Sequence, residues 1–241
     1  MTRLLIHVEG QTEESFVNEL LAPYLYSKGF TLVSARIVGN ARQRDRRGGI
    51  KPWPAVRKGI LNHLRQDAGC LVSTMIDFYG LPQSGASAWP GRHAAATSGY
   101  AVKASTVENA LLKDITQHMG ESFNRERFVP YVMMHEYEAM LFSDCRAFGR
   151  GIGTPALAGQ FQAVRDAFGS PEEIDDSPQT APSKRVENLV PGYSKPLLGT
   201  LAALEIGLDA IRRECPHFRS WLGRLEAGLN ASSYPSATDS R

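Results

Sequence analysis

Four acids that closely follow predicted strands are the strongest candidates for chemistry in this sequence. They are Glu9, Asp77, Glu136 and Glu138. Carboxylates that converge repel one another and need a cation, and hard oxygen ligands of this kind suit Mg²⁺ or Mn²⁺. A divalent ion held in this way activates water and bridges phosphate oxygens, as in phosphoryl transfer. The alternative is that each acid caps a helix or a turn, a common position for Asp and Glu.

The elements that must position these acids alternate along the chain. Apolar and helical patterns predict strand 4–8, helix 12–28, strand 31–37, helix 53–66, strand 70–76, helix 106–119 and strand 128–134. Strands that alternate with helices form parallel sheets, whose ligands bind at the carboxyl ends of the strands. We therefore expect Glu9 and Asp77 to be neighbours. Thr12 is the expected N-cap of the first helix, and Pro130 favours an edge position for the last strand.

The remainder of the chain is predicted to be helical, with patterns at 156–168, 197–213 and 218–229. The expected domain organisation is an α/β core at 1–144, a helical appendage packed on it at 145–229 and a disordered tail at 230–241. Within the core we expect a basic loop at 39–52 and a long, functional or mobile loop at 80–104.

Glu136 and Glu138 are alternatives for completing the site. In a regular helix the two side chains point about 200° apart, so only one faces the site, whereas in an extended segment both could. His135 and Glu138 share a helical face, which slightly favours Glu138 if a helix begins early.

Composition excludes several classes of protein. Hydrophobic residues at 42%, charged residues at 22% and a mean hydropathy of −0.26 are typical of a soluble globular chain. No stretch approaches the ~18 apolar residues of a membrane span, and no signal-peptide pattern is present, so a cytoplasmic protein is expected. The three cysteines lie far apart without a C-x-x-C pair, which argues against disulfides and zinc ribbons.

Positive charge is concentrated in one window of the sequence. Between Arg36 and Arg65 there are nine Lys or Arg and one acid, although the net charge of the chain is only +2. A positive surface on a mildly acidic body is one way to hold a polyanion, and a solvated basic loop is the alternative.

Two segments resemble the motifs of toprim domains, which occur in topoisomerases, primases and the overcoming-lysogenisation-defect nucleases. Val8-Glu9-Gly10-Gln11-Thr12-Glu13 is similar to their Glu-bearing first motif, and Ile76-Asp77-Phe78-Tyr79-Gly80 falls where their Asp-x-Asp motif is expected. Tyr79 replaces the second Asp of that motif. Because a phenol is a poor ligand for a hard metal at neutral pH, this departure predicts a one-metal or weak-metal site.

Nearly the whole chain, to about Leu229, resembles domain-of-unknown-function family 4276. The segments that carry this resemblance are Thr74–Pro82, His135–Asp144, Ala181–Arg185, Cys215–Phe218 and Trp221–Leu222. It implies a toprim-like (Rossmann-like) α/β fold, with a mostly parallel sheet flanked by helices and a C-terminal helical appendage. It also implies a link to phage defence and an ATPase partner protein, which another chain must supply because no G-x-x-x-x-G-K-[ST] motif is present.

The leading functional hypothesis is a nuclease, a phosphodiesterase that depends on Mg²⁺ or Mn²⁺ and acts on DNA or RNA. Its expected metal ligands are Glu9, Asp77 and Glu138; Glu9 is alternatively the general base, and Glu136 is the other candidate for completing the site. The expected contacts with the nucleic-acid backbone are Arg42, Arg44, Arg46, Arg47, Lys51, Lys184 and Arg185. The alternatives are a non-catalytic toprim-like module that binds nucleic acid or a partner, and a hydrolase of small phosphorylated substrates or nucleotides.

Overall fold

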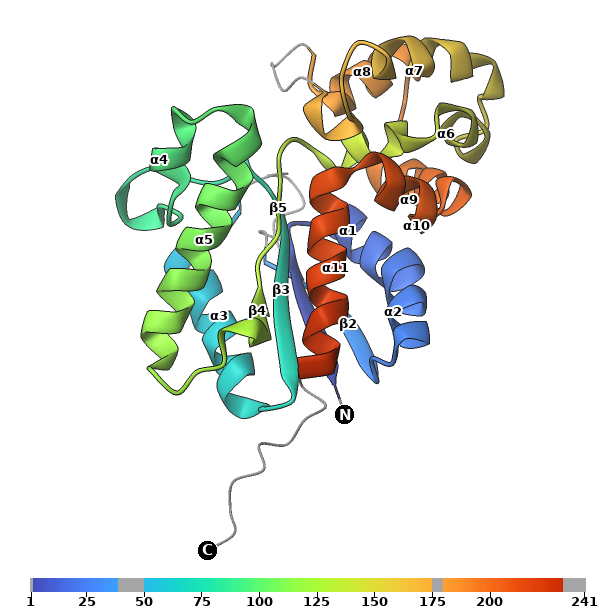
Figure 1. Ribbon diagram of the computed structural model, residues 1–241. Helices are drawn as coiled ribbons and strands as arrows, with labels where there is room; N and C mark the ends of the chain where they lie inside the picture. Colours follow the sequence, from blue (N-terminus) through green and yellow to red (C-terminus); the bar gives the residue numbers. More distant parts are fainter. Residues whose placement is uncertain (1, 39–49, 175–179, 232–241) are drawn as a thin grey trace, which may run out of the picture.

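A parallel sheet with helices on both faces forms the centre of the molecule (Figure 1). The computed structural model describes residues 2–38, 50–174 and 180–231. Its strands are β1 (Arg3–Val8), β2 (Leu32–Ile37), β3 (Cys70–Asp77), β4 (Phe128–Val129) and β5 (Val132–Met133). The strand order is β2-β1-β3-β4, with β5 also paired to β3, and the pairings are parallel. The predicted α/β class, with a parallel sheet and C-terminal helices, is confirmed.

The register of β1 and β3 brings their carboxyl ends to the same edge of the sheet. Val8 lies opposite Met75, so Glu9 follows one strand at the level where the other ends in Asp77. The two apolar strand sequences are enough to predict this juxtaposition, because neighbouring parallel strands have their carboxyl ends at the same edge of the sheet.

The predicted strand 128–134 is instead two short strands, interrupted at Pro130 and Tyr131. Proline has no N–H to donate to the ladder, and Thr74 bridges the gap: its hydroxyl donates to the Tyr131 carbonyl and accepts from the Tyr131 N–H, both at 3.0 Å. The strand segment β4 lies at the end of the strand order, as the proline predicted.

Helices make up most of the rest of the described chain. The α-helices are α1 (Gln11–Phe16), α2 (Ala22–Lys28), α3 (Trp53–Gln66), α4 (Arg92–Ala96), α5 (Tyr100–Met119), α6 (Cys145–Gly151), α7 (Ala158–Arg165), α8 (Pro182–Leu189), α9 (Lys195–Ile206), α10 (Leu208–Glu214) and α11 (Pro216–Ala231). The π-helical turn η1 (Val17–Leu21) joins α1 to α2. The 3₁₀ turns are η2 (Gly85–Ser87), η3 (Arg125–Arg127), η4 (Tyr137–Ser143), η5 (Pro155–Leu157) and η6 (Pro171–Glu173).

Both faces of the sheet are buried. Leu71 and Met75 of β3 pack into a cluster with residues of α1, α2 and α11, whereas Val72 and Ile76 pack into a second cluster with α3 and α5. Side chains that alternate between two hydrophobic layers explain why this strand is a continuous apolar run rather than an alternating pattern.

The last helix, α11, closes one face of the sheet (Figure 1). The indole N–H of Trp221 donates to the Ser73 hydroxyl at 2.9 Å, and its ring stacks on Tyr131 at 4.5 Å. Glu172 accepts the N–H groups of His217 and Phe218 at the start of α11. The cluster that contains β1 and α1 also contains residues of α6, α9 and α11, and the domain boundary at 144 stays a prediction.

Several helix limits differ from the sequence-based expectations. Helix α5 begins at Tyr100 rather than near residue 106, and α4, α6 and α8 were not predicted. The segment 80–104, expected to be a long loop, contains α4 and the start of α5. The pattern at 197–213 is two helices, because Gly207 between them has a φ of +78°. Gly10, not Thr12, is the N-cap of α1. Helix α3 has the predicted bounds.

Some predictions concern residues outside the described ranges. They are most of the basic loop, at 39–49, and nearly all of the tail, at 232–241. Within the described ranges, no helix has the length and apolar character needed to cross a membrane.

Two helical glycines provide a matched test of the packing between α6 and α9. A Cβ on Gly151 would lie 2.7 Å from the Ala202 Cα and 2.9 Å from the Leu201 carbonyl oxygen, whereas nothing lies within 4 Å of a Cβ on Gly159 in α7. We expect Gly151→Ala to lower the free energy of unfolding by about 1–3 kcal/mol because backbone atoms must move apart. Gly159→Ala should raise it by up to about 1 kcal/mol. Urea denaturation of both variants checks this, and equal effects would contradict the close approach.

Candidate functional site

Glu9 and Asp77 are neighbours at the carboxyl edge of the sheet, as predicted from the strand pattern. The Asp77 N–H lies 3.4 Å from the Glu9 Oε2, a long and weak hydrogen bond. Both Glu9 carboxylate oxygens also lie 3.5 Å from where a Cβ would stand on Gly80, so the turn after β3 wraps around this carboxylate. Asp77 is half-buried, and its buried Oδ1 has no hydrogen-bond partner among the described residues.

Glu13 is a further acid of the site, which the sequence placed in the segment that resembles the first toprim motif but not among the candidate site residues. Its Oε2 accepts the Gly10 N–H at 3.0 Å, which satisfies a backbone donor at the start of α1. Burial raises its pKa, and the nearby Glu9 charge raises it further. The capping role and the membership of an acidic cluster therefore coexist in one side chain.

Glu136 and Glu138 both approach Lys195 at the first residue of α9. The Lys195 Nζ lies 3.3 Å from the Glu138 Oε2 and 4.0 Å from the Glu136 Oε1. Both can do so because Glu136 is extended and the 3₁₀ turn η4 begins at Tyr137, so the 200° separation of a regular helix does not apply. Glu136 is the more accessible of the two, with 31% of its side chain exposed against 2% for Glu138.

Helix α8 supplies a second compensating group. The Ser183 N–H in its first turn donates to the Glu136 Oε2 at 2.8 Å, so this carboxylate lies at the positive end of the helix dipole. The segments His135–Asp144 and Ala181–Arg185, far apart in sequence, thus meet at this contact.

Burial dominates the electrostatics of the cluster. It raises the pKa of Glu9, and it raises the pKa of Glu138 to about 7 even though Lys195 lowers it in part. Asp77 has the largest set of repelling neighbours. Burial, followed by the charges of Glu9, Glu13, Glu136 and Glu138, raises its pKa well above the usual value. Within the described chain, the cation that lowers the pKa values of Glu9, Glu13 and Glu138 is Lys195.

The donor chemistry of this cluster fits a hard divalent cation. Two buried oxygens, Asp77 Oδ1 and Glu138 Oε1, have no hydrogen-bond partner within the described part of the chain, and a cation could satisfy them. The geometry is not preformed, however: across the ranges that the structure covers, no three His, Cys, Asp or Glu side chains are grouped as a metal site. Binding of Mg²⁺ or Mn²⁺ therefore requires the carboxylates to rotate toward one another.

Tyr79, which replaces the second acid of the toprim-type motif, is engaged elsewhere. Its ring is nearly parallel to that of His135, at a centroid distance of 5.7 Å. The Lys103 Nζ lies 3.1 Å from its hydroxyl. The position thus carries an aromatic group beside the carboxylates in place of a further anion.

The residues predicted to contact nucleic acid are only partly covered by the structure. Arg42, Arg44, Arg46 and Arg47 lie outside the described residues. Lys51 is exposed, and its carbonyl accepts from the Trp89 indole. Lys184 pairs with Glu187 at 2.5 Å, and the Arg185 Nε donates to the Thr180 carbonyl at 2.7 Å. Their contacts with nucleic acid stay predictions.

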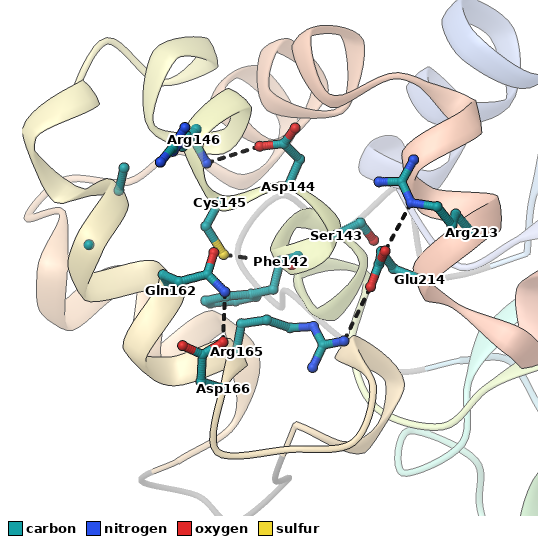
Figure 2. Close-up of a pocket in the computed structure, with 12 residues that line it drawn as sticks. Phe142, Ser143, Asp144, Cys145, Arg146, Gln162, Arg165, Asp166, Arg213 and Glu214 are labelled. Carbon is teal, nitrogen blue, oxygen red and sulfur yellow. Dashed lines mark hydrogen bonds and ion pairs between the residues drawn. The ribbon is translucent and has the colours of Figure 1, made fainter.

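A cavity of about 710 Å³ opens in the C-terminal helical region, formed by α6, α7 and α10 together with η4 (Figure 2). Its lining includes several charged groups, and some of these pair with one another. Arg165 and Arg213 both contact Glu214, at 3.3 and 3.0 Å, and Gln162 donates to Asp166. None of the predicted catalytic acids lines it. We therefore place the candidate site at the sheet edge rather than in this cavity.

The fold and this edge define an α/β protein whose acidic side chains gather at the carboxyl ends of parallel strands. The chain belongs to the family described as a domain of unknown function, DUF4276, whose sequence profile matches residues 8–226. The family resemblance inferred from the sequence is thus confirmed.

Solved structures similar to the chain include two of the C-terminal region of the Xanthomonas campestris pv. campestris OLD protein, one phased with platinum and one with iodine. Both are 14% identical to this chain. The platinum-phased structure has a TM-score of 0.45, and the match covers 95% of this chain and 95% of that chain. The iodine-phased structure has a TM-score of 0.44, and the match covers 96% of this chain and 97% of that chain. No curated protein matches the chain. At this level of similarity the two structures transfer no residue role to it.

Lys195 was not found by sequence reasoning. It stands at the start of a helix about 60 residues after Glu136 and Glu138, and no local pattern distinguishes it from other surface lysines. Only the packing of α9 against α1 and η4 brings it to the acids.

Removing the positive charge of Lys195 should destabilise the fold in a pH-dependent way. The raised pKa of Glu138 means that the folded chain holds this proton more tightly than the unfolded chain. Stability from this group therefore falls as pH rises from about 4.5 to about 7. We expect Lys195→Met to cost about 1–2 kcal/mol more at pH 8 than at pH 5.5, because the ionised acids then lack their counter-charge.

Urea denaturation at the two pH values measures this difference, with Lys184→Met as the matched control. The pair of Lys184 with Glu187 is exposed, so its loss should change stability little at either pH. A Lys195→Met variant whose cost is the same at both pH values would show that Lys195 does not compensate the acidic cluster.

Proposed function

We propose that this protein is a divalent-metal-dependent phosphodiesterase that acts on nucleic acid. The observation that supports the proposal is the group of buried or half-buried acids at the ends of β1, β3 and β5, which Lys195 balances only in part. Charges that repel at this edge favour the entry of a cation with hard oxygen ligands. When bound, Mg²⁺ or Mn²⁺ would activate water and neutralise charge on a phosphate.

The residues of the chain have separable roles in this proposal. Glu9 and Asp77 would hold the metal, and Glu136, the more accessible acid of its pair, would complete the set. Glu138 is almost fully buried and contacts Lys195, so it would position this lysine rather than touch substrate. Lys195, 40% of whose side chain is exposed, would attract a phosphate oxygen to the edge of the cluster.

A non-catalytic module that binds nucleic acid is the second candidate. It is favoured by the absence, in the part of the chain that the structure describes, of three ready-placed metal ligands, and by the aromatic residue at position 79. The proposed nuclease would act in phage defence beside an ATPase, which would be a separate chain.

Cleavage and metal binding should fail together when a ligand is removed. We expect the wild type to cut plasmid DNA or RNA in Mn²⁺, and Glu9→Gln and Asp77→Asn to lower the rate at least 100-fold because each removes an anionic ligand. Glu121→Gln, at an exposed position, is the matched control and should keep full activity. A wild type that binds nucleic acid without cutting it would favour the non-catalytic module.

Metal binding has its own readout in the melting temperature. Mn²⁺ at about 100 times its Kd should stabilise the wild type by about 2.7 kcal/mol, because the ion binds the folded site. The same concentration should leave Asp77→Asn nearly unchanged, and EDTA should abolish the shift. Differential scanning calorimetry at pH 8 measures this, and identical shifts in both proteins would place the ion elsewhere.

A further inference from the structure

Three aromatic rings from separate parts of the chain stack beside the acidic cluster. The ring of His135, which follows β5, stacks with Tyr79 after β3 and with Tyr100 at the start of α5. The centroid distances are 5.7 Å to Tyr79 and 5.8 Å to Tyr100, with interplanar angles of 4° and 23°. We call these three residues the aromatic stack.

The aromatic stack adjoins the proposed catalytic edge through the chain itself. Tyr79 is two residues beyond Asp77, and His135 directly precedes Glu136. A group that rests on the stack would therefore lie close to the residues that carry the Asp77 and Glu136 carboxylates. Phosphates and bases alternate along one strand, so a strand with a base on the stack would carry its neighbouring phosphate toward the carboxylates.

The exposure of the two tyrosines distinguishes them from core aromatics. Tyr79 is 42% exposed and Tyr100 is 38% exposed, whereas their neighbours Phe78 and Tyr131 are almost fully buried. Large rings held parallel to a neighbour and open to solvent retain apolar surface that another flat ring could cover.

Positive charge accompanies the aromatic stack. The Lys103 Nζ lies 5.5 Å from the Tyr79 ring centroid and bonds its hydroxyl. The Arg92 guanidinium lies 4.0 Å from the centroid of Phe78, and its Nε donates to the Phe78 carbonyl at 2.9 Å. Arg92 is buried and fixes the turn that carries Tyr79, while Lys103 is partly exposed and can meet a phosphate.

We propose that the aromatic stack binds unpaired bases, so that the preferred ligand of this edge is single-stranded nucleic acid. The inference rests on the proposed function, because it takes the carboxylate edge as the place where the phosphodiester bond lies. Stacking on an aromatic ring is available to any base but requires a free base face, which a duplex does not offer. The site would then select strand state rather than sequence.

Fluorescence anisotropy in EDTA tests this without any cleavage. The probes are a labelled 12-nucleotide DNA strand of mixed sequence, its duplex, and an abasic strand of the same length. We expect the wild type to prefer the single strand, and Tyr79→Ala and Tyr100→Ala each to weaken that binding about 10-fold. Tyr79→Phe, which keeps the ring, should bind within about twofold of wild type.

The matched control is Tyr26→Ala, which removes a similarly exposed tyrosine from α2 and should leave binding unchanged. Thermal unfolding of each variant shows whether it folds, and Tyr79→Trp provides a second route. Its indole should bind the single strand at least as tightly as wild type, and its fluorescence should be quenched by bases but not by the abasic strand.

Three results would overturn the inference. They are equal affinity of the wild type for duplex and single strand, unchanged single-strand binding by Tyr79→Ala, and a loss of affinity on Tyr79→Ala that is as large for the abasic strand as for the intact strand. The proposed nuclease activity fails separately. A protein that loses single-strand binding on Tyr79→Ala but cuts nothing in Mn²⁺ has the aromatic stack without the catalysis. One that cuts in Mn²⁺ with unaltered binding in Tyr79→Ala has the catalysis without the stack.

Discussion

Repulsion among acids at the carboxyl ends of β1, β3 and β5 is the constraint around which this structure is arranged. Burying a carboxylate without a partner costs free energy, and here Glu13 and Glu138 are buried beside three half-buried acids, Glu9, Asp77 and Glu136. Part of the cost is offset from the second half of the chain, by Lys195 of α9 and by the Ser183 N–H of α8. The C-terminal helices therefore cover apolar surface and also reduce the free-energy cost of placing several acids at this edge.

The positive groups balance the acids only in part, and the remaining negative charge is what allows this edge to bind protons or a cation. A fully balanced cluster would not have raised pKa values and would attract a further cation less strongly. Here no group in the described ranges bonds the Asp77 Oδ1, and the pKa of Asp77 is raised well above the usual value. The free energy stored in this arrangement is released when protons or metal ions bind, so both should compete for the same oxygens.

The sequence allowed the acids to be located but not their surroundings. A continuous apolar strand and the parallel rule suffice to bring Glu9 beside Asp77, because register follows from the buried runs. Lys195 was missed because it reaches the acids only through helix packing. The choice between Glu136 and Glu138 depended on a 3₁₀ turn, which a 3.6-residue period does not describe. Helix α5 begins earlier than predicted, at Tyr100, and the extended residue Gly99 is its N-cap.

Helix α11 has a consequence for the order in which the chain acquires its structure during synthesis. It supplies Trp221 to a face of the sheet whose strands are complete by residue 133. About 90 residues must follow those strands from the ribosome before α11 joins α1 and α2 on that face, so the nascent chain exposes the part that α11 covers for several seconds at ordinary translation rates.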